Sequence, residues 1–318
     1  MIFEPRASAI LYNILKSNDT DKIYIIPSNV CPIVPITFLK ADRKFELIDI
    51  NDDTLCLDEE VVLKKLKYSP NKYAGVLFVR TYGTDKCFEP FFKRIKEISG
   101  KHLVIDDRCL SVPNYKYVDT YADVILYSTG YSKIVDLGYG GFAQIKETIN
   151  YRKYQTIYSK DSHIELTNNY KQRIEARSPY IYKDSDWLDN SNIDRTFENH
   201  VLLIQEEQSK STEIKKKINK IYSDNLPHNA QLDPDFQLWR FNIRVPNKNT
   251  ILKYLFANDL FASSHFASLK GIFSEGVAAN AEKLHSTVIN LFNDKYYSEE
   301  KAYKTVEIIN EHINNKKF

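Results

Sequence analysis

Short apolar runs alternate with helical segments over the first 145 residues, and this alternation constrains the fold more than any other feature. Most of the runs are rich in β-branched or aromatic side chains, which is typical of strands. The expected strands are residues 22–26, 44–50, 75–79, 102–106, 123–127 and 140–145, and the expected helices are 6–16, 30–41, 58–67 and 88–98. This order predicts an α/β fold whose mostly parallel sheet is covered by helices on both faces.

The rest of the chain predicts a smaller C-terminal unit. The 318 residues exceed the usual domain length of about 100–150 residues. A long helical stretch at 195–222 is followed by a segment with two prolines, a pattern that breaks a helix. Beyond it we expect a strand at 238–245 and helices at 248–257, near 276–291 and at 297–314. The sequence therefore predicts a large domain over 1–225 and a small α+β domain over 226–318.

Charge and composition exclude several classes of protein. The 44 basic residues nearly balance the 42 acidic ones, and the one dense basic run, 213–222, has the spacing of a solvated helix face, so we expect no nucleic-acid partner. No apolar run approaches the roughly 18 residues of a membrane span, and the N-terminus lacks a signal pattern, so we expect no membrane partner. The four cysteines show no paired spacing, which argues against a disulfide framework or a metal site and favours the cytoplasm.

Polar side chains follow the predicted strands where ligands of parallel sheets bind. Asp106 and Asp107 stand where one strand ends, Ser128 directly follows another, and Lys133 comes five residues after Ser128. A lysine at this edge loses part of its hydration, and its amine can then act as a nucleophile. A strand-end aspartate can pair with a protonated ring nitrogen, as a pyridoxal phosphate (PLP) ring requires. Adjacent strand residues point to opposite faces, so only one of the two aspartates can do so.

A third feature is the start of the first helix. Ala7 and Ser8 are small, and the free backbone N–H groups there can hold a phosphate. Each of these features alone has an ordinary structural explanation: a surface lysine, an aspartate that caps a turn, or a plain helix start. The functional hypothesis rests on the combination of these features and on their order along the chain.

Together these features resemble the fold-type I PLP-dependent enzymes, and within them the DegT/DnrJ family of sugar aminotransferases, in a short subgroup. The resemblance extends over nearly the whole chain, into the predicted C-terminal strand, turn and last two helices. The stretches that carry it in the first half are PRASAI (5–10), IIPSNVCPIV (25–34), LFVRTYGTD (77–85), VIDDRCLS (104–111) and YSTGYSKIVDLGYGGFA (127–143).

The resemblance implies roles for individual residues. It implies that Lys133 is the catalytic lysine that binds PLP covalently and that Asp107 pairs with the pyridine nitrogen. It also implies that Ala7, Ser8 and Ser128 hold the phosphate. These five residues form the centre of the predicted site.

Other positions match the family pattern less closely. Cys31 or Asn29 stands where most members stack an aromatic ring on the cofactor. Asn192, together with Arg195, is a loose match to the segment that reaches the cofactor of the other subunit. His265 falls in a turn near the substrate entrance. A glutamine and a histidine of the family pattern are replaced by Leu110 and Gly130.

The resemblance implies an aminotransferase that acts on a nucleotide-linked keto sugar, with glutamate as amino donor, in surface polysaccharide or deoxyamino-sugar biosynthesis. It also implies a homodimer with the active site at the subunit interface. The polar segment 146–192 is expected to be a surface loop that reaches the neighbouring subunit, with Trp187, Tyr180 and Tyr182 as anchors. Two alternatives stay open: a PLP enzyme of another type, such as a decarboxylase or dehydratase, and a non-catalytic PLP-fold protein.

Overall fold

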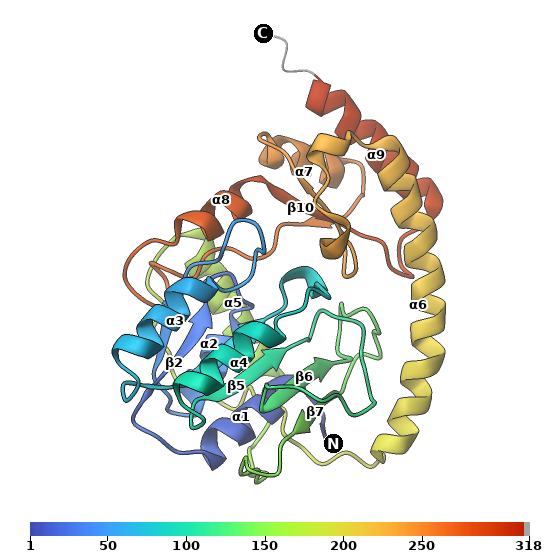
Figure 1. The fold of residues 1–318 in the computed structure, drawn as a ribbon. Helices are drawn as coiled ribbons and strands as arrows, with labels where there is room; N and C mark the ends of the chain where they lie inside the picture. Colours follow the sequence, from blue (N-terminus) through green and yellow to red (C-terminus); the bar gives the residue numbers. More distant parts are fainter. Residues whose placement is uncertain (315–318) are drawn as a thin grey trace.

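The computed structural model describes residues 1–314, and the first half of the chain forms one seven-stranded sheet (Figure 1). Its spatial order is β1-β7-β6-β5-β4-β2-β3. The five strands from β6 to β3 run parallel, whereas β7 is antiparallel to both β6 and β1. The strands are β1 (Ile2–Glu4), β2 (Ile23–Pro27), β3 (Phe45–Ile48), β4 (Tyr73–Val79), β5 (Leu103–Asp107), β6 (Val124–Ser128) and β7 (Gly141–Ile145).

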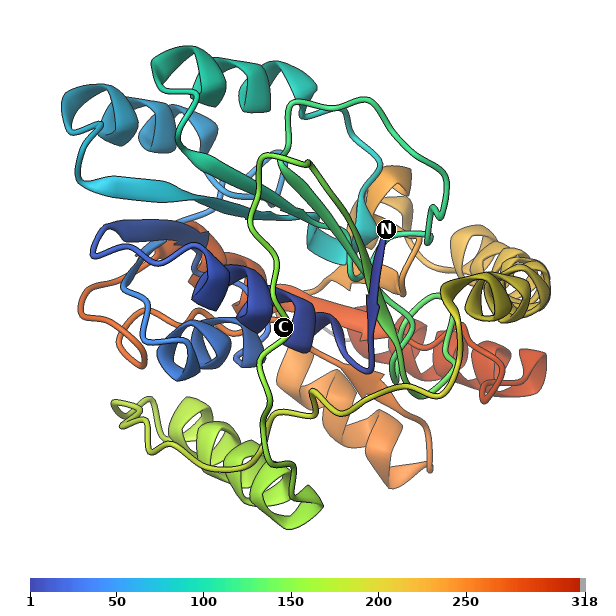
Figure 2. The same cartoon turned by 90° about the horizontal axis from the view of Figure 1, so that it is seen from below.

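Helices cover both faces of this sheet, as Figure 2 shows. Side chains of β4 alternate between two apolar cores, with Val76 and Phe78 in one and Leu77 and Val79 in the other. The first core includes α3 (Glu59–Tyr68) and α4 (Glu89–Ile98), and the second includes α1 (Ala7–Ser17) and α2 (Ile33–Lys40). The prediction of a mostly parallel sheet covered on both faces is therefore confirmed.

The local sequence explains where these helices begin. The Asp58 carboxylate accepts a hydrogen bond from the backbone N–H of Val61 at 3.1 Å, which caps α3. Glu59 and Glu60 in its first turn and lysines in its last turn match the helix dipole. In α4, Phe91, Phe92 and Ile95 form the buried face.

The C-terminal unit contains a three-stranded antiparallel sheet in the order β8-β10-β9. Its strands are β8 (Phe241–Arg244), β9 (Ala262–Ser263) and β10 (Val288–Leu291), and its helices are α7 (Lys248–Ala257), α8 (Ala279–Thr287) and α9 (Glu299–Asn314). The prediction of one helix over 276–291 is wrong for its last four residues. Val288 and Ile289 are β-branched and fully buried, and they complete the sheet as part of its central strand.

One long helix, α6 (Phe197–Asn225), lies beside both parts of the chain (Figure 1). Ile204 packs in a core of the large sheet, whereas Ile218 and Tyr222 pack with the C-terminal unit. The boundary between 225 and 226 coincides with the end of α6 and stays a prediction. Short 3-10 helices lie at Thr81–Gly83, His228–Ala230 and Pro234–Phe236. Within residues 1–314, no helix has the length and apolar character needed to cross a bilayer.

The segment 146–192 contains a helix that the sequence analysis missed, α5 (Lys160–Glu175). Only Leu166 of this helix is buried, so its sequence shows little apolar periodicity. Leu166 and Trp187 pack against Ile36 of α2, and Tyr180 and Tyr182 lie at the margin of the same cluster. Trp187 is 1% exposed within its own chain, so its prediction as an interface anchor is wrong.

Candidate functional site

The candidate site lies at the carboxyl ends of β5 and β6. Asp107 is the last residue of β5, and Ser128 is the last residue of β6. Along each strand the faces alternate, so Asp107 points with Ile105 and Ser128 points with Leu126. Both of those apolar residues belong to the core that includes Ala7 of α1. The two polar side chains therefore share the face on which α1 begins.

Asp106 and Asp107 occupy very different surroundings. Asp106 is fully buried on the opposite face and pairs with Arg80 at 3.0 Å and with Arg108 at 2.7 Å. Asp107 accepts a hydrogen bond from the backbone N–H of Cys109 at 2.9 Å. Burial raises the pKa of Asp107, and the nearby positive charge of Lys133 opposes this rise. Asp106 is thus held in an ion-pair network, while Asp107 lies within reach of the charge of Lys133.

Lys133 lies half-buried in the loop between β6 and β7. Its charge lowers the pKa values of Asp107, Cys31 and Cys109, against the larger effect of burial, which raises all three. The lysine amine therefore lies near enough to all three groups for its charge to act on them. The fold thus brings together Lys133, Asp107 and Cys31, which are far apart in the sequence.

A candidate phosphate cradle adjoins this cluster. A Cβ atom on Gly141 would lie 2.2 Å from the backbone nitrogen of Ala7, so only glycine lets α1 begin directly against β7. A Cβ atom on Gly130 would lie 3.5 Å from Ser128 Oγ and 3.7 Å from Arg6 Nη1. Ser128, Arg6 and the first turn of α1, where Ser8 is half-buried, therefore converge at a positive helix end.

Arg6 is a residue of this cradle that the sequence analysis missed. Its Nη1 donates a hydrogen bond to the Gly138 carbonyl at 2.8 Å, and its guanidinium lies 5.8 Å from the centre of the Tyr131 ring. Its Nε is 3.8 Å from the Asp189 carboxylate. The sequence could have indicated Arg6 by its position directly before α1, the predicted phosphate-binding helix, but its contact with the β6–β7 loop depends on the fold.

Buried oxygens at the end of β2 support a ligand at this edge. Ser28 Oγ and Asn29 Oδ1 have no hydrogen-bond partner among residues 1–314. The Asn29 amide donates to the Leu55 carbonyl at 3.2 Å, so its side chain is held in place. Unpaired polar atoms are rare in protein interiors and call for an explanation such as a bound group. Together with the lysine, the buried carboxyl group and the phosphate cradle, these atoms fit PLP.

Two other predicted residues, Asn192 and Arg195, are exposed at the surface. Asn192 is exposed, and within residues 1–314 no hydrogen bond joins it to Lys133, Asp107 or Ser128. Arg195 is also exposed, and its guanidinium donates a hydrogen bond to the Tyr139 hydroxyl of its own chain. A single chain therefore does not bring Asn192 to the cluster.

His265 lies close enough to the site to sense its charge. Burial lowers the pKa of His265 to about 4, and the charges of Arg240 and Lys133 add to the effect. Its carbonyl accepts a hydrogen bond from the Tyr82 hydroxyl at 2.6 Å. The imidazole is therefore neutral at physiological pH.

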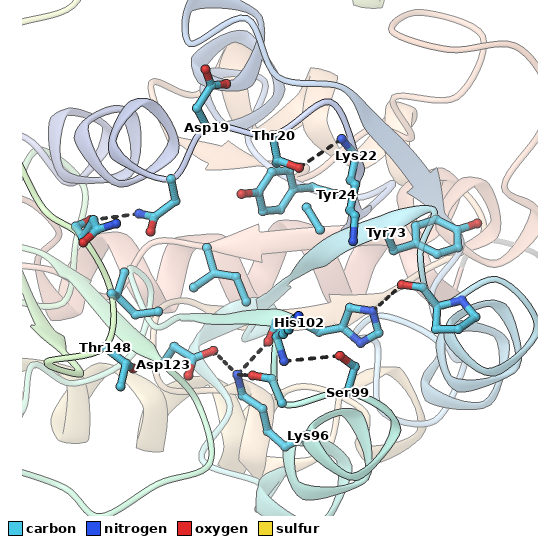
Figure 3. A pocket seen from close by; sticks show the side chains of 18 of the residues that line it. Asp19, Thr20, Lys22, Tyr24, Tyr73, Lys96, Ser99, His102, Asp123 and Thr148 are labelled. Atoms are coloured by element: carbon cyan, nitrogen blue, oxygen red, sulfur yellow. Dashed lines mark hydrogen bonds and ion pairs between the residues drawn. The ribbon is translucent and has the colours of Figure 1, made fainter.

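A polar cavity of about 660 Å³ lies at the other edge of the sheet (Figure 3). It is lined by Tyr24, Tyr73 and His102, which stand at the starts of parallel strands or just before them. Lys96 also lines the cavity, and its amine donates hydrogen bonds to the His102 carbonyl at 2.6 Å and to the Asp123 carboxylate. Ligands of parallel sheets bind at the opposite edge, where Lys133 and Asp107 lie.

Comparisons with known proteins support this assignment of the fold. No family model matches the sequence, and no curated protein matches it. Solved structures do match. A DegT DnrJ EryC1 StrS aminotransferase from Brucella abortus has a TM-score of 0.66 and 14% identity, with coverage of 99% of this chain and 86% of the other.

Two further solved structures match over a similar share of both chains. PseC of Helicobacter pylori, an aminotransferase involved in the biosynthesis of pseudoaminic acid, has a TM-score of 0.69 at 14% identity, with coverage of 98% and 86%. The GDP-4-keto-6-deoxy-D-mannose-3-dehydratase of Escherichia coli, with bound hydrated PLP, has a TM-score of 0.61 at 15% identity, with coverage of 96% and 86%. The chain thus has the fold of these enzymes, and the predicted fold-type I architecture is confirmed.

Proposed function

We propose that this chain is a PLP-dependent aminotransferase that converts a nucleotide-linked keto sugar to an amino sugar, with glutamate as amino donor. The observation that carries the proposal is the convergence of Lys133, Asp107 and the α1 cradle at one edge of the sheet. Surface polysaccharide or deoxyamino-sugar biosynthesis is the expected setting. A cytoplasmic location, inferred from the cysteine spacing, and a homodimer, implied by the family resemblance, belong to the same proposal.

The residues fit distinct parts of the cofactor. Ser128 and the N–H groups of Ala7 and Ser8 would hold the phosphate, with the positive end of α1 aimed at it. The Asp107 carboxylate would pair with the protonated ring nitrogen, and Cys31 would lie against the ring. When bound, PLP supplies an electron sink for the bond being broken in the amino acid or sugar.

Lys133 would act as both anchor and proton carrier. Its amine would bind the cofactor covalently and, once displaced by the donor amine, would move a proton between the substrate carbon and the cofactor carbon. Asp107 is suited to its role because it is buried, and an ion pair with a ring nitrogen is strong in such surroundings. A positive partner there would also oppose the effect of burial, which raises the pKa of Asp107.

A second candidate is another reaction on the same cofactor. One of the similar structures is a dehydratase with bound PLP, so this fold serves reactions other than amino transfer. The replacement of the family's histidine and glutamine by Gly130 and Leu110 changes the surroundings in which a substrate would react. A decarboxylase or dehydratase is therefore the alternative that the experiment must separate.

The test begins with PLP binding. We expect the purified chain to develop an absorbance band near the edge of the visible range on addition of PLP, and borohydride to fix the cofactor on Lys133. Glutamate should then bleach this band and release 2-oxoglutarate in an equal amount. Absence of cofactor binding rejects the proposal, and binding without 2-oxoglutarate favours the second candidate.

A Lys133→Ala variant should lose both the band and turnover. Lys116 is exposed and lies outside the site, so Lys116→Ala is a matched control that should retain both. Unchanged absorbance and activity in Lys133→Ala would show that another residue binds the cofactor.

A further inference from the structure

The carbonyl groups of the two residues next to Lys133 are held by side chains from the later part of the chain. Trp239 Nε1 donates a hydrogen bond to the Ser132 carbonyl at 2.6 Å. Ser211 Oγ donates to the Ile134 carbonyl at 2.6 Å. The loop that carries Lys133 is thus hydrogen-bonded through the residue before the lysine and through the residue after it.

The residue before the lysine has an unusual backbone conformation. Ser132 has a φ of 60°, in the left-handed region that residues other than glycine seldom adopt. Its N–H donates to Asp136 Oδ2 at 2.9 Å, and its carbonyl is the group that Trp239 holds. Because both of its backbone polar groups are bonded, this conformation is fixed, and with it the direction in which Lys133 leaves the loop.

Helix α6 supports both of these hydrogen bonds. Ser211 and Lys215 are one turn apart on this helix and so lie on the same face. The Lys215 amine is buried and donates to the Trp239 carbonyl and to Asn293 Oδ1, each at 2.8 Å. A continuous set of contacts therefore runs from α6 through Trp239 to the Lys133 loop.

The Trp239 ring is itself fixed by packing. It is 5% exposed and stacks on Tyr82, with ring centres 6.4 Å apart and planes 6° apart. Trp239 is therefore a rigid hydrogen-bond donor, and its N–H has a defined target.

We infer that Trp239 and Ser211 are positioning residues that hold the carbonyl groups of Ser132 and Ile134, the residues on either side of Lys133, and thereby aim its amine toward Asp107. The inference rests on the proposed function, in which that amine binds the cofactor. Neither residue needs to touch the substrate. Their effect is to keep the lysine in the one orientation from which it attacks efficiently.

The chain offers a matched pair of tryptophans for the test. Trp239→Phe removes the N–H donor and keeps an aromatic ring. Trp187 is 1% exposed, and its Nε1 has no hydrogen-bond partner among residues 1–314, so Trp187→Phe makes the same change without loss of a bond. Two rates are measured for each variant: covalent attachment of PLP, and labelling of Lys133 by a small acylating reagent without PLP, relative to the exposed Lys64.

We expect Trp239→Phe to slow PLP attachment about tenfold, because misaimed reacting groups lose rate steeply. Labelling of Lys133 should become faster than in the wild type, because the released side chain is more accessible. Trp187→Phe should stay within about twofold of wild type in both rates. Ser211→Ala should change both rates in the same direction as Trp239→Phe. If Trp239→Phe fails to fold, the two rates of Ser211→Ala serve as the test.

Melting temperatures are recorded alongside, so that a general loss of stability is recognised by its equal presence in Trp187→Phe. Rates in Trp239→Phe and Ser211→Ala that equal those of Trp187→Phe would overturn the inference. If the wild type takes up no PLP while Lys133 labelling still rises in Trp239→Phe and Ser211→Ala, the proposed function fails and the positioning role stands.

Discussion

At the scale of single residues, the two adjacent aspartates separate a structural role from a chemical one. Asp106 pairs with Arg80 and Arg108 on one face, and Asp107 lies on the other, where the charge of Lys133 acts on it. The sequence could predict that only one aspartate faces the site, because strand residues alternate. It could not predict the ion pairs of Asp106, since Arg80 is 26 residues away in the chain.

The paired variants Asp107→Asn and Asp106→Asn should therefore fail in different ways. Asp107→Asn should lower turnover by about a hundredfold, because an amide cannot hold the ring nitrogen protonated. Asp106→Asn should destabilise the fold by about 3–5 kcal/mol, because it leaves the buried guanidinium charge of Arg80 uncompensated. Steady-state kinetics and denaturant unfolding of both variants separate the two effects. A larger turnover defect in folded Asp106→Asn would mean that the roles are exchanged.

The predicted and missed site residues differ in the kind of signal they carry. Lys133, Asp107 and Ser128 stand just after apolar strands, so their place at the sheet edge could be predicted from local pattern. Arg6 and Trp239 reach the same loop through contacts 132 and 107 residues apart in the chain. No local pattern contains such pairs, and only the fold shows them.

At the scale of elements, strands buried on both faces were the most predictable parts. Their apolar runs stand out because neither face meets water. β10 was missed because α8 leads straight into it without a break between Thr287 and Val288. α5 was missed for the opposite reason, since a mostly exposed helix carries few apolar residues to mark its period.

The close approach of α1 to β7 gives a prediction about the phosphate cradle. In Gly141→Ala the new methyl group would lie 2.2 Å from Ala7 N, so α1 must shift. We expect a loss of about 1–3 kcal/mol in stability and weaker binding of PLP. A Cβ on Gly100 meets nothing within 4 Å, so Gly100→Ala is the matched control and should change stability by less than about 0.5 kcal/mol. Equal behaviour of the two variants in titrations with PLP would contradict the assignment.

Helix α6 gives a prediction about pH. Burial lowers the pKa of Lys215 to about 7 from its usual 10.5, and the charge of Arg240 adds to this effect. Between about pH 7 and pH 10 the unfolded chain then binds one more proton than the native chain at this site. The free energy of unfolding should therefore rise with pH across that window, by up to about 1.4 kcal/mol per pH unit.

Lys215→Met isolates this contribution, because methionine does not titrate and fills a similar space. Denaturant unfolding of wild type and variant at pH 7, 8 and 9 should show a steeper rise for the wild type. Parallel curves would indicate that Lys215 keeps its proton in the native state throughout.

At the scale of the whole molecule, several large apolar side chains are exposed. Tyr131, two residues before the lysine, is 72% exposed, and Ile181 and Val277 are each 71% exposed. Single exposed apolar residues are common on monomers, so the expectation of a second subunit rests on the family resemblance, and these residues are available for such a contact. The burial of Trp187 removes one predicted anchor, and these exposed residues are better candidates for the contact.

We therefore expect a homodimer in which Asn192 or Arg195 of one subunit meets the phosphate or substrate of the other. Light scattering at working concentration measures the first part, and a stable monomer with full activity would reject a shared site. For the second part, Lys133→Ala subunits are mixed with Asn192→Ala/Arg195→Ala subunits, both inactive alone. A heterodimer then holds one intact site, so complete exchange should restore about a quarter of the wild-type sites. If exchange is verified by mass spectrometry and no activity returns, the segment around Asn192 acts within its own subunit, as the bond of Arg195 to Tyr139 would then indicate.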